Sequence, residues 1–148
     1  MKKLLQVLAV VTPAALGLIG AAYFMSSPTP AAAADKGQEQ VKKGLRIMNQ
    51  VVAHTGRLVV AKEYDHVAHE HEEVLEAKEI LDESLTVEQK TKVDATLVKA
   101  VAASTTLKGT AATKDAAKTE AAHAAFAASV KDLLALFPAD MQPPPPKK

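Results

Sequence analysis

Apolar residues recur every three or four positions through most of the chain after residue 40, which is the period of a helix with one buried face. The first stripe predicts a helix with Met48 towards the interior, and it consists of Val41, Leu45, Met48, Val52, Thr55 and Val59. The second stripe predicts another helix, and it consists of Val60, Tyr64, Val67, His71, Val74, Lys78, Leu81 and Leu85. We expect the link between Gly56 and Asp65, with one long helix over residues 41–85 as the alternative.

A third helix is predicted from Val87 to about Leu107, and its inward-facing residues are Val93, Leu97, Val101 and Leu107. Thr86 precedes it and Gln89 follows three positions later, the pattern of a capping box. We expect Gly109 to end this helix, because glycine is favoured just past the last turn.

The fourth predicted helix runs from about Ala111 to Phe137, and Pro138 stops it. The residues from Met141 onward are rich in proline, which predicts an extended, exposed tail. Period-two alternation is not sustained anywhere after residue 34, so no strand is expected. The expected fold class is therefore all-α, an up-down-up-down four-helix bundle over residues 35–137 with a disordered tail over 138–148.

Residues 1–34 have the pattern of a secretory signal peptide. Lys2 and Lys3 precede an uncharged apolar run over residues 4–25, and Ala32 to Ala34 give the small-residue pattern of a cleavage site. We expect Asp35 to be the first mature residue and the protein to be periplasmic or secreted. The alternative is an uncleaved membrane anchor, since the apolar run is long enough to span a bilayer.

The composition excludes several classes of site. The chain has no cysteine, which rules out disulfides, thiolate metal sites and covalent haem attachment through cysteines. Without Lys2 and Lys3 there are 16 basic and 17 acidic residues, so charge gives no reason to expect nucleic acid. No nucleophile elbow, phosphate loop or zinc-hydrolase spacing is present, and we do not expect an enzyme.

Met48 and His123 are the first candidate site. In an up-down bundle the first and fourth helices are antiparallel neighbours. At 1.5 Å per residue, Met48 is expected about 15 Å above the base and His123 about 18 Å below the top of a bundle about 33 Å tall. Methionine and histidine at one level across a core are the axial ligands of a low-spin haem.

Three short stretches, Arg46–Met48, Ala53–Leu58 and His123–Phe126, resemble the cytochrome c′ and cytochrome b562 family of exported four-helix bundles. The resemblance implies a haem protein that transfers electrons to a redox partner protein. It also implies that Met48 lies on the distal side of the haem and that His123 is the proximal ligand.

The chain departs from this family in one respect that limits the cofactor. Thr119 and Ala122 stand where c-type members have cysteines, so the resemblance implies a non-covalent b-type haem. His71 lies on the apolar stripe near the same level and is a reserve ligand. An alternative register places residues 133–137 at the haem-binding turn, without a histidine, and implies a haemless relative.

A second candidate site is the histidine-rich stretch over residues 63–73. Its four candidate ligands share one side of a helix, and they are His66, His69, Glu70 and Glu73. Imidazole and carboxylate at this spacing suit zinc, copper or nickel, so the alternative function is a haemless metal-binding bundle. A solvated charged face is the other interpretation of this stretch, and a plain interaction protein is the other haemless function. A homodimer is a separate expectation for the partner.

Overall fold

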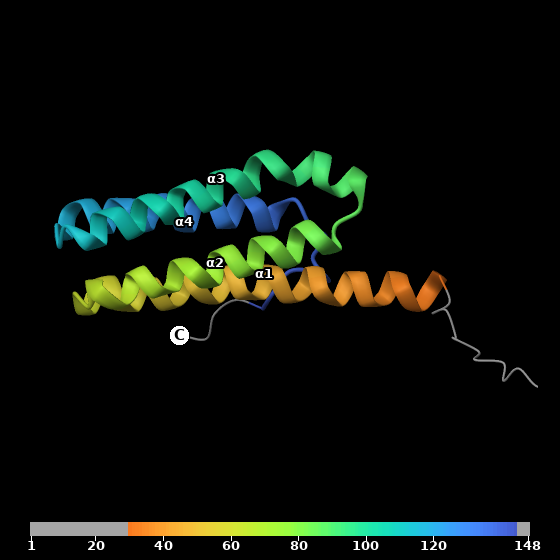
Figure 1. Ribbon diagram of the computed structural model, residues 1–148, viewed down its shortest axis with the longest axis horizontal. Helices are drawn as coiled ribbons and strands as arrows, with labels where there is room; N and C mark the ends of the chain where they lie inside the picture. Colours follow the sequence, from red (N-terminus) through yellow and green to blue (C-terminus); the bar gives the residue numbers. More distant parts are fainter. Residues whose placement is uncertain (1–29, 145–148) are drawn as a thin grey trace, which may run out of the picture.

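The computed structural model describes residues 30–144, and these form a four-helix bundle (Figure 1). The helices are α1 (Pro30–Ala61), α2 (Tyr64–Ser84), α3 (Val87–Ala112) and α4 (Ala116–Ala135). Consecutive helices run antiparallel, and α1 contacts α2 and α4, while α3 contacts the same two helices. The prediction of an all-α, up-down-up-down bundle is confirmed for this part of the chain.

The α1–α2 link is only Lys62 and Glu63, which lies inside the interval that the sequence predicted. Lys62 adopts the left-handed conformation, with φ of 61°. The amide of Glu63 donates to the carbonyl of Leu58 at 2.9 Å, which satisfies one of the free carbonyl groups at the end of α1. The alternative of one long helix is wrong, and Gly56 remains inside α1.

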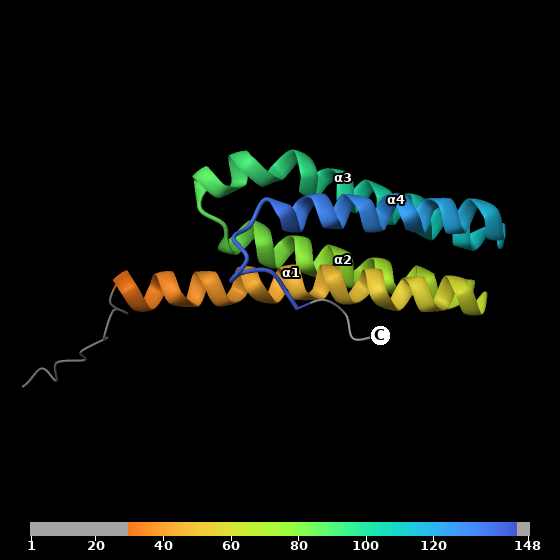
Figure 2. The same cartoon turned by 180° about the vertical axis from the view of Figure 1, so that it is seen from behind.

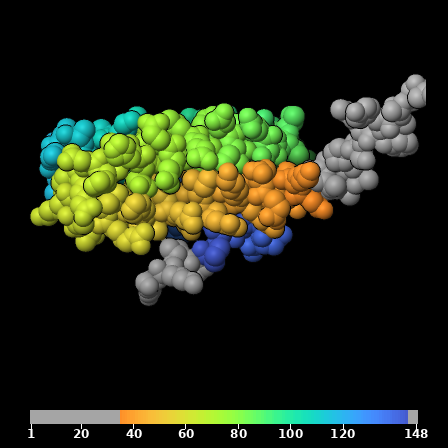
Figure 3. Space-filling model, turned by 60° about the horizontal axis from the view of Figure 1, so that its bottom comes forward, coloured from red at the N-terminus to blue at the C-terminus, as the bar shows by residue number. Residues whose placement is uncertain are grey.

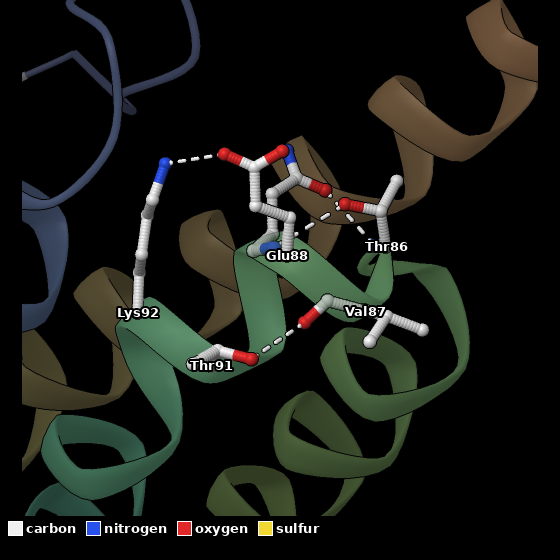
Figure 4. A network of polar contacts seen from close by, with 6 residues as sticks. Thr86, Val87, Glu88, Thr91 and Lys92 are labelled. Carbon is white, nitrogen blue, oxygen red and sulfur yellow. Dashed lines mark hydrogen bonds and ion pairs between the residues drawn. The ribbon is translucent and has the colours of Figure 1, made fainter.

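The predicted capping box begins α3 (Figure 4). The Thr86 hydroxyl accepts from the Gln89 amide at 3.3 Å, and the Gln89 side chain accepts from the Thr86 amide at 3.0 Å. Two amide donors at the start of the helix are therefore satisfied.

The predicted end of α3 at Gly109 is wrong, because the helix continues to Ala112 and α4 begins at Ala116 instead of Ala111. The turn is made by Lys114, which adopts the left-handed conformation with φ of 55°. Asp115 then caps α4 by accepting a hydrogen bond from the Lys118 amide at 3.1 Å. These two residues, rather than the glycine, determine where the chain reverses.

The core consists mainly of valine, leucine and alanine with one central aromatic ring, that of Phe126, which is fully buried. α1 and α2 approach closely at Gly44, where an added Cβ would lie 2.8 Å from Leu81 Cγ. This contact fixes the relative height of the two helices near the base of the bundle.

The segment after α4 folds back along α1, as Figures 2 and 3 show. The Met141 side chain is buried, and it lines a cavity of about 230 Å³ with residues from the start of α1 and the α2–α3 link. The structure thus differs from the exposed tail that the proline content predicted, because one apolar side chain fixes its first part. The end of the tail, residues 145–148, lies outside the described residues.

The predicted signal segment falls largely outside the described residues, and α1 begins at Pro30, before the predicted first mature residue Asp35. Within residues 30–144, no helix has the length and apolar character needed to cross a membrane.

Candidate functional site

The two predicted haem ligands lie at different levels of the bundle. Met48 is fully buried in the core. The Nε2–H of His123 donates to the carbonyl of Val52 at 3.0 Å, and an added Cβ at Gly56 would lie 3.1 Å from the ring. Val52 and Gly56 are about 6 and 12 Å farther along α1 than Met48. The structure therefore does not bring Met48 and His123 together as an axial pair.

The residues around His123 do not fit a haem. Its groove, about 510 Å³ between α1 and α4, is lined by Val52, Gly56 and other α1 residues and does not include Met48. The nitrogen that would bind iron already donates to a backbone carbonyl. The reserve ligand, His71, faces a different helix, because its Nδ1 hydrogen-bonds the Ser104 hydroxyl of α3 at 2.7 Å. Burial, with a smaller effect from the Lys108 ammonium, lowers the pKa of His71 below its usual 6.5.

The predicted metal face divides into two parts. His66, His69 and Glu73 are exposed on α2, whereas Glu70 is buried against α1. Among residues 30–144, no three histidine or acidic side chains gather closely enough to hold a metal ion.

Glu70 instead pairs with a histidine that the sequence interpretation did not single out. His54 Nδ1 of α1 lies 2.9 Å from Glu70 Oε1 of α2, within ion-pairing distance. The residue Glu70 is only 8% exposed, and its second oxygen, Oε2, is buried without a hydrogen-bond partner. Burying a carboxylate oxygen without a hydrogen-bond donor costs from about 1 to several kcal/mol of folding free energy.

A pocket of about 480 Å³ opens beside this pair, between α1 and α2. Its polar lining comes from both helices, and its outer wall is Pro143 and Pro144 of the returning tail; the residues are Arg46, Asn49, Gln50, Ala53, His54, Arg57, Glu70, Glu73, Pro143 and Pro144. The volume lies within the range of about 300–1,000 Å³ typical of small-molecule sites.

Arg46 and Arg57 are the only arginines of the chain, whose other 16 basic residues are lysines. Both line this pocket. Within the described part of the chain, neither guanidinium has a carboxylate within ion-pairing distance. The pocket is therefore lined by two guanidinium groups without an ion-pair partner among the described residues and by one buried carboxylate.

The sequence contained a signal for this pocket that our interpretation missed. Arg46 and Arg57 are eleven residues apart, just over three helical turns, and so lie on the same face of α1. His54 lies near that face, and the tail residues carry no comparable local signal.

No protein family matches the chain, and neither a characterised protein nor a solved structure shows significant similarity to it. The resemblance to the cytochrome c′ and cytochrome b562 family therefore stays a prediction from three short stretches of sequence.

Proposed function

We propose that the protein is an exported, haemless four-helix bundle that binds a small polar solute in the pocket between α1 and α2, without catalysing a reaction. Export rests on the signal pattern of residues 1–34. The observation that carries the binding function is the Glu70 carboxylate, which is buried, has no donor at Oε2 within the described chain and lines a pocket together with both arginines.

Ligand binding accounts for a group that is otherwise unfavourable. A bound hydrogen-bond donor at the Glu70 carboxylate would offset part of the desolvation penalty of this buried group. The penalty is already present in the free protein, so the offset adds to the affinity. Glu70 packs between two helices of a rigid core, which also preorganises the site and limits the ordering cost of binding.

The test is a thermal-unfolding screen of the purified protein against small polar solutes, namely amino acids, polyols, amines and carboxylates, and divalent zinc, copper and nickel. We expect at least one organic solute to raise the midpoint, because a ligand at about 100 times its Kd stabilises the folded state by about 2.7 kcal/mol. The effect should be lost in Glu70→Gln. It should remain in Glu79→Gln, which changes an exposed carboxylate on the same helix. The proposal fails if no organic solute acts, or if Glu70→Gln responds like the wild type.

A haemin titration tests the haemless part separately. We expect no saturating Soret shift, because His123 Nε2 is bonded to Val52 and lies away from the level of Met48. A one-to-one Soret shift that disappears in both Met48→Ala and His123→Ala would establish the b-type cytochrome instead.

A further inference from the structure

Resting on the proposed function, we infer the class of the solute: a small zwitterion with a protonated amine bound by the Glu70 carboxylate and a carboxylate bound by Arg57, as in a free amino acid. The inference follows from the charged groups that line the pocket without an ion-pair partner in the described part of the chain and from the positions of the two arginines along α1.

The amine is required by Glu70. A carboxylate accepts hydrogen bonds and donates none, and the one ion-pair partner of Glu70 among the described residues is His54, whose Nδ1 lies 2.9 Å from Oε1. His54 is half-exposed, and no lysine or arginine lies within ion-pairing distance of Glu70 among the described residues. An ammonium group in the pocket supplies both a donor for the Glu70 carboxylate and a compensating charge, whereas a hydroxyl group supplies only the donor.

The carboxylate is required by the arginines. Sixteen of the 18 basic residues are lysines, so the two arginines at one pocket are a departure from the rest of the chain. A guanidinium group binds a carboxylate through two parallel hydrogen bonds, which a lysine cannot do. A solvated surface position needs no such geometry, and elsewhere this chain uses lysine at such positions.

Arg57 is the better placed of the two. It follows His54 by three residues, about 4.5 Å along α1, and helical side chains lean towards the N-terminus of their helix. From this position its guanidinium is within reach of the level of the His54–Glu70 pair. Arg46 lies about 12 Å from His54 in the other direction, where Glu73 on α2 offers an opposite charge.

The remaining walls suit the uncharged part of such a ligand. Ala53 of α1 and the two tail prolines, Pro143 and Pro144, contribute apolar surface to a pocket that is otherwise polar. The lining has two basic and two acidic residues besides His54, a balance that favours a zwitterion over a dianion or a polyamine.

The experiment uses matched probes in isothermal titration calorimetry. The twenty standard amino acids are tested first, and the best ligand is then compared with its decarboxylated amine and its deaminated acid. Charge-assisted hydrogen bonds contribute about 1.5–3 kcal/mol, so loss of either group should weaken binding roughly 10- to 150-fold. Glu70→Gln should remove the preference for the amine, and Arg57→Gln the preference for the carboxylate.

Two control variants isolate the pocket from general charge effects. Glu79→Gln and Lys43→Gln change exposed residues on α2 and α1 outside the pocket lining and should leave the affinities unchanged. Circular dichroism confirms that each variant retains its helices.

The outcomes separate this inference from the proposed function. If a polyol or an amine-free acid binds as tightly as any amino acid, and does so through Glu70, the zwitterion is wrong and the pocket's binding function stands. If no organic solute binds in a Glu70-dependent way, even if a divalent metal does, both are wrong.

Discussion

The close approach of α1 to α2 at Gly44 predicts that one methyl group there will destabilise the bundle. In Gly44→Ala the new Cβ would lie 2.8 Å from Leu81 Cγ and 3.2 Å from the carbonyl oxygen of Ala77. The Leu81 side chain is fully buried, and the Ala77 carbonyl belongs to the backbone of α2. Neither group can move away without displacing its neighbours.

The magnitude follows from two opposing effects. Overpacking a core by a methyl group typically costs about 1–3 kcal/mol. Alanine in a helix interior is better than glycine by about 1 kcal/mol, which offsets part of that cost. We expect a net loss of up to about 2 kcal/mol in the free energy of unfolding.

Gly109 provides the matched control within the same protein. It lies inside α3, and an added Cβ would meet no atom within 4 Å. Gly109→Ala should therefore stabilise the protein by about 0.5–1 kcal/mol through helix propensity alone. The same chemical change should thus have opposite signs at the two positions.

Urea unfolding followed by circular dichroism at 222 nm measures both variants, and unchanged slopes would show that the midpoints report stability. The expected difference between the variants is about 2 kcal/mol, roughly a 30-fold ratio of their folding equilibrium constants. If Gly44→Ala stabilised the protein as much as Gly109→Ala, the two helices would not be in contact at this position, and the packing argument would be refuted.

Two further predictions concern single polar groups. Thr86→Ala removes the capping hydroxyl of α3 and should lower the free energy of unfolding in urea by about 1 kcal/mol. The control is Thr91→Ala, whose hydroxyl bonds only within α3 and whose loss should change stability by less than about 0.5 kcal/mol. Equal effects of the two substitutions would contradict the cap. Burial lowers the pKa of His71 in the folded state, so the unfolded chain binds more protons at this residue. Its contribution to the free energy of unfolding should therefore fall as the pH decreases from about 6.5 towards the folded-state pKa. Urea unfolding at several pH values measures this, and His71→Gln should lose less stability than the wild type over that pH interval. Identical stability profiles of the two proteins would contradict the prediction.

The sequence predicted helices wherever the signal was local. The capping box at Thr86 lies within four residues, and the three- and four-residue periodicity identifies each buried face without reference to the others. The reversals at Lys62 and Lys114 were harder, because lysine rarely adopts the left-handed conformation and has no sequence signature for it. Gly109 has such a signature, yet it lies inside α3, because glycine at an exposed helix position reduces stability without ending the helix.

The first part of the tail could not be predicted from composition. Prolines exclude a helix but do not determine whether the chain extends into solvent or lies against the bundle. Met141 decides this, since its side chain is buried near the base of α1, and the next prolines then reach the pocket wall. The position of the tail therefore depends on a cavity between α1, the α2–α3 link and Met141, and no local sequence pattern predicts such a cavity.

The predicted height of a side chain in a bundle depends on where its helix begins. The expected match of Met48 with His123 assumed that α4 began at Ala111, whereas it begins at Ala116. The five-residue difference raises His123 by about 7.5 Å, towards Gly56 and away from Met48. His123 lies seven residues after the start of α4, at the height of the residue seven positions before the end of α1, which is His54. His54 lies between Val52 and Gly56, the two residues that are close to the His123 ring.

The His54–Glu70 pair is less sensitive to such errors, because it lies across the shortest link in the bundle. His54 is seven residues from the end of α1, and Glu70 is six residues from the start of α2, so a two-residue link places them at almost equal height. An error of one residue in this link moves the pair by about 1.5 Å, less than a glutamate side chain can accommodate. The contact on which the proposed pocket depends is therefore fixed by local chain geometry, whereas a haem between α1 and α4 would require two distant helix ends to agree.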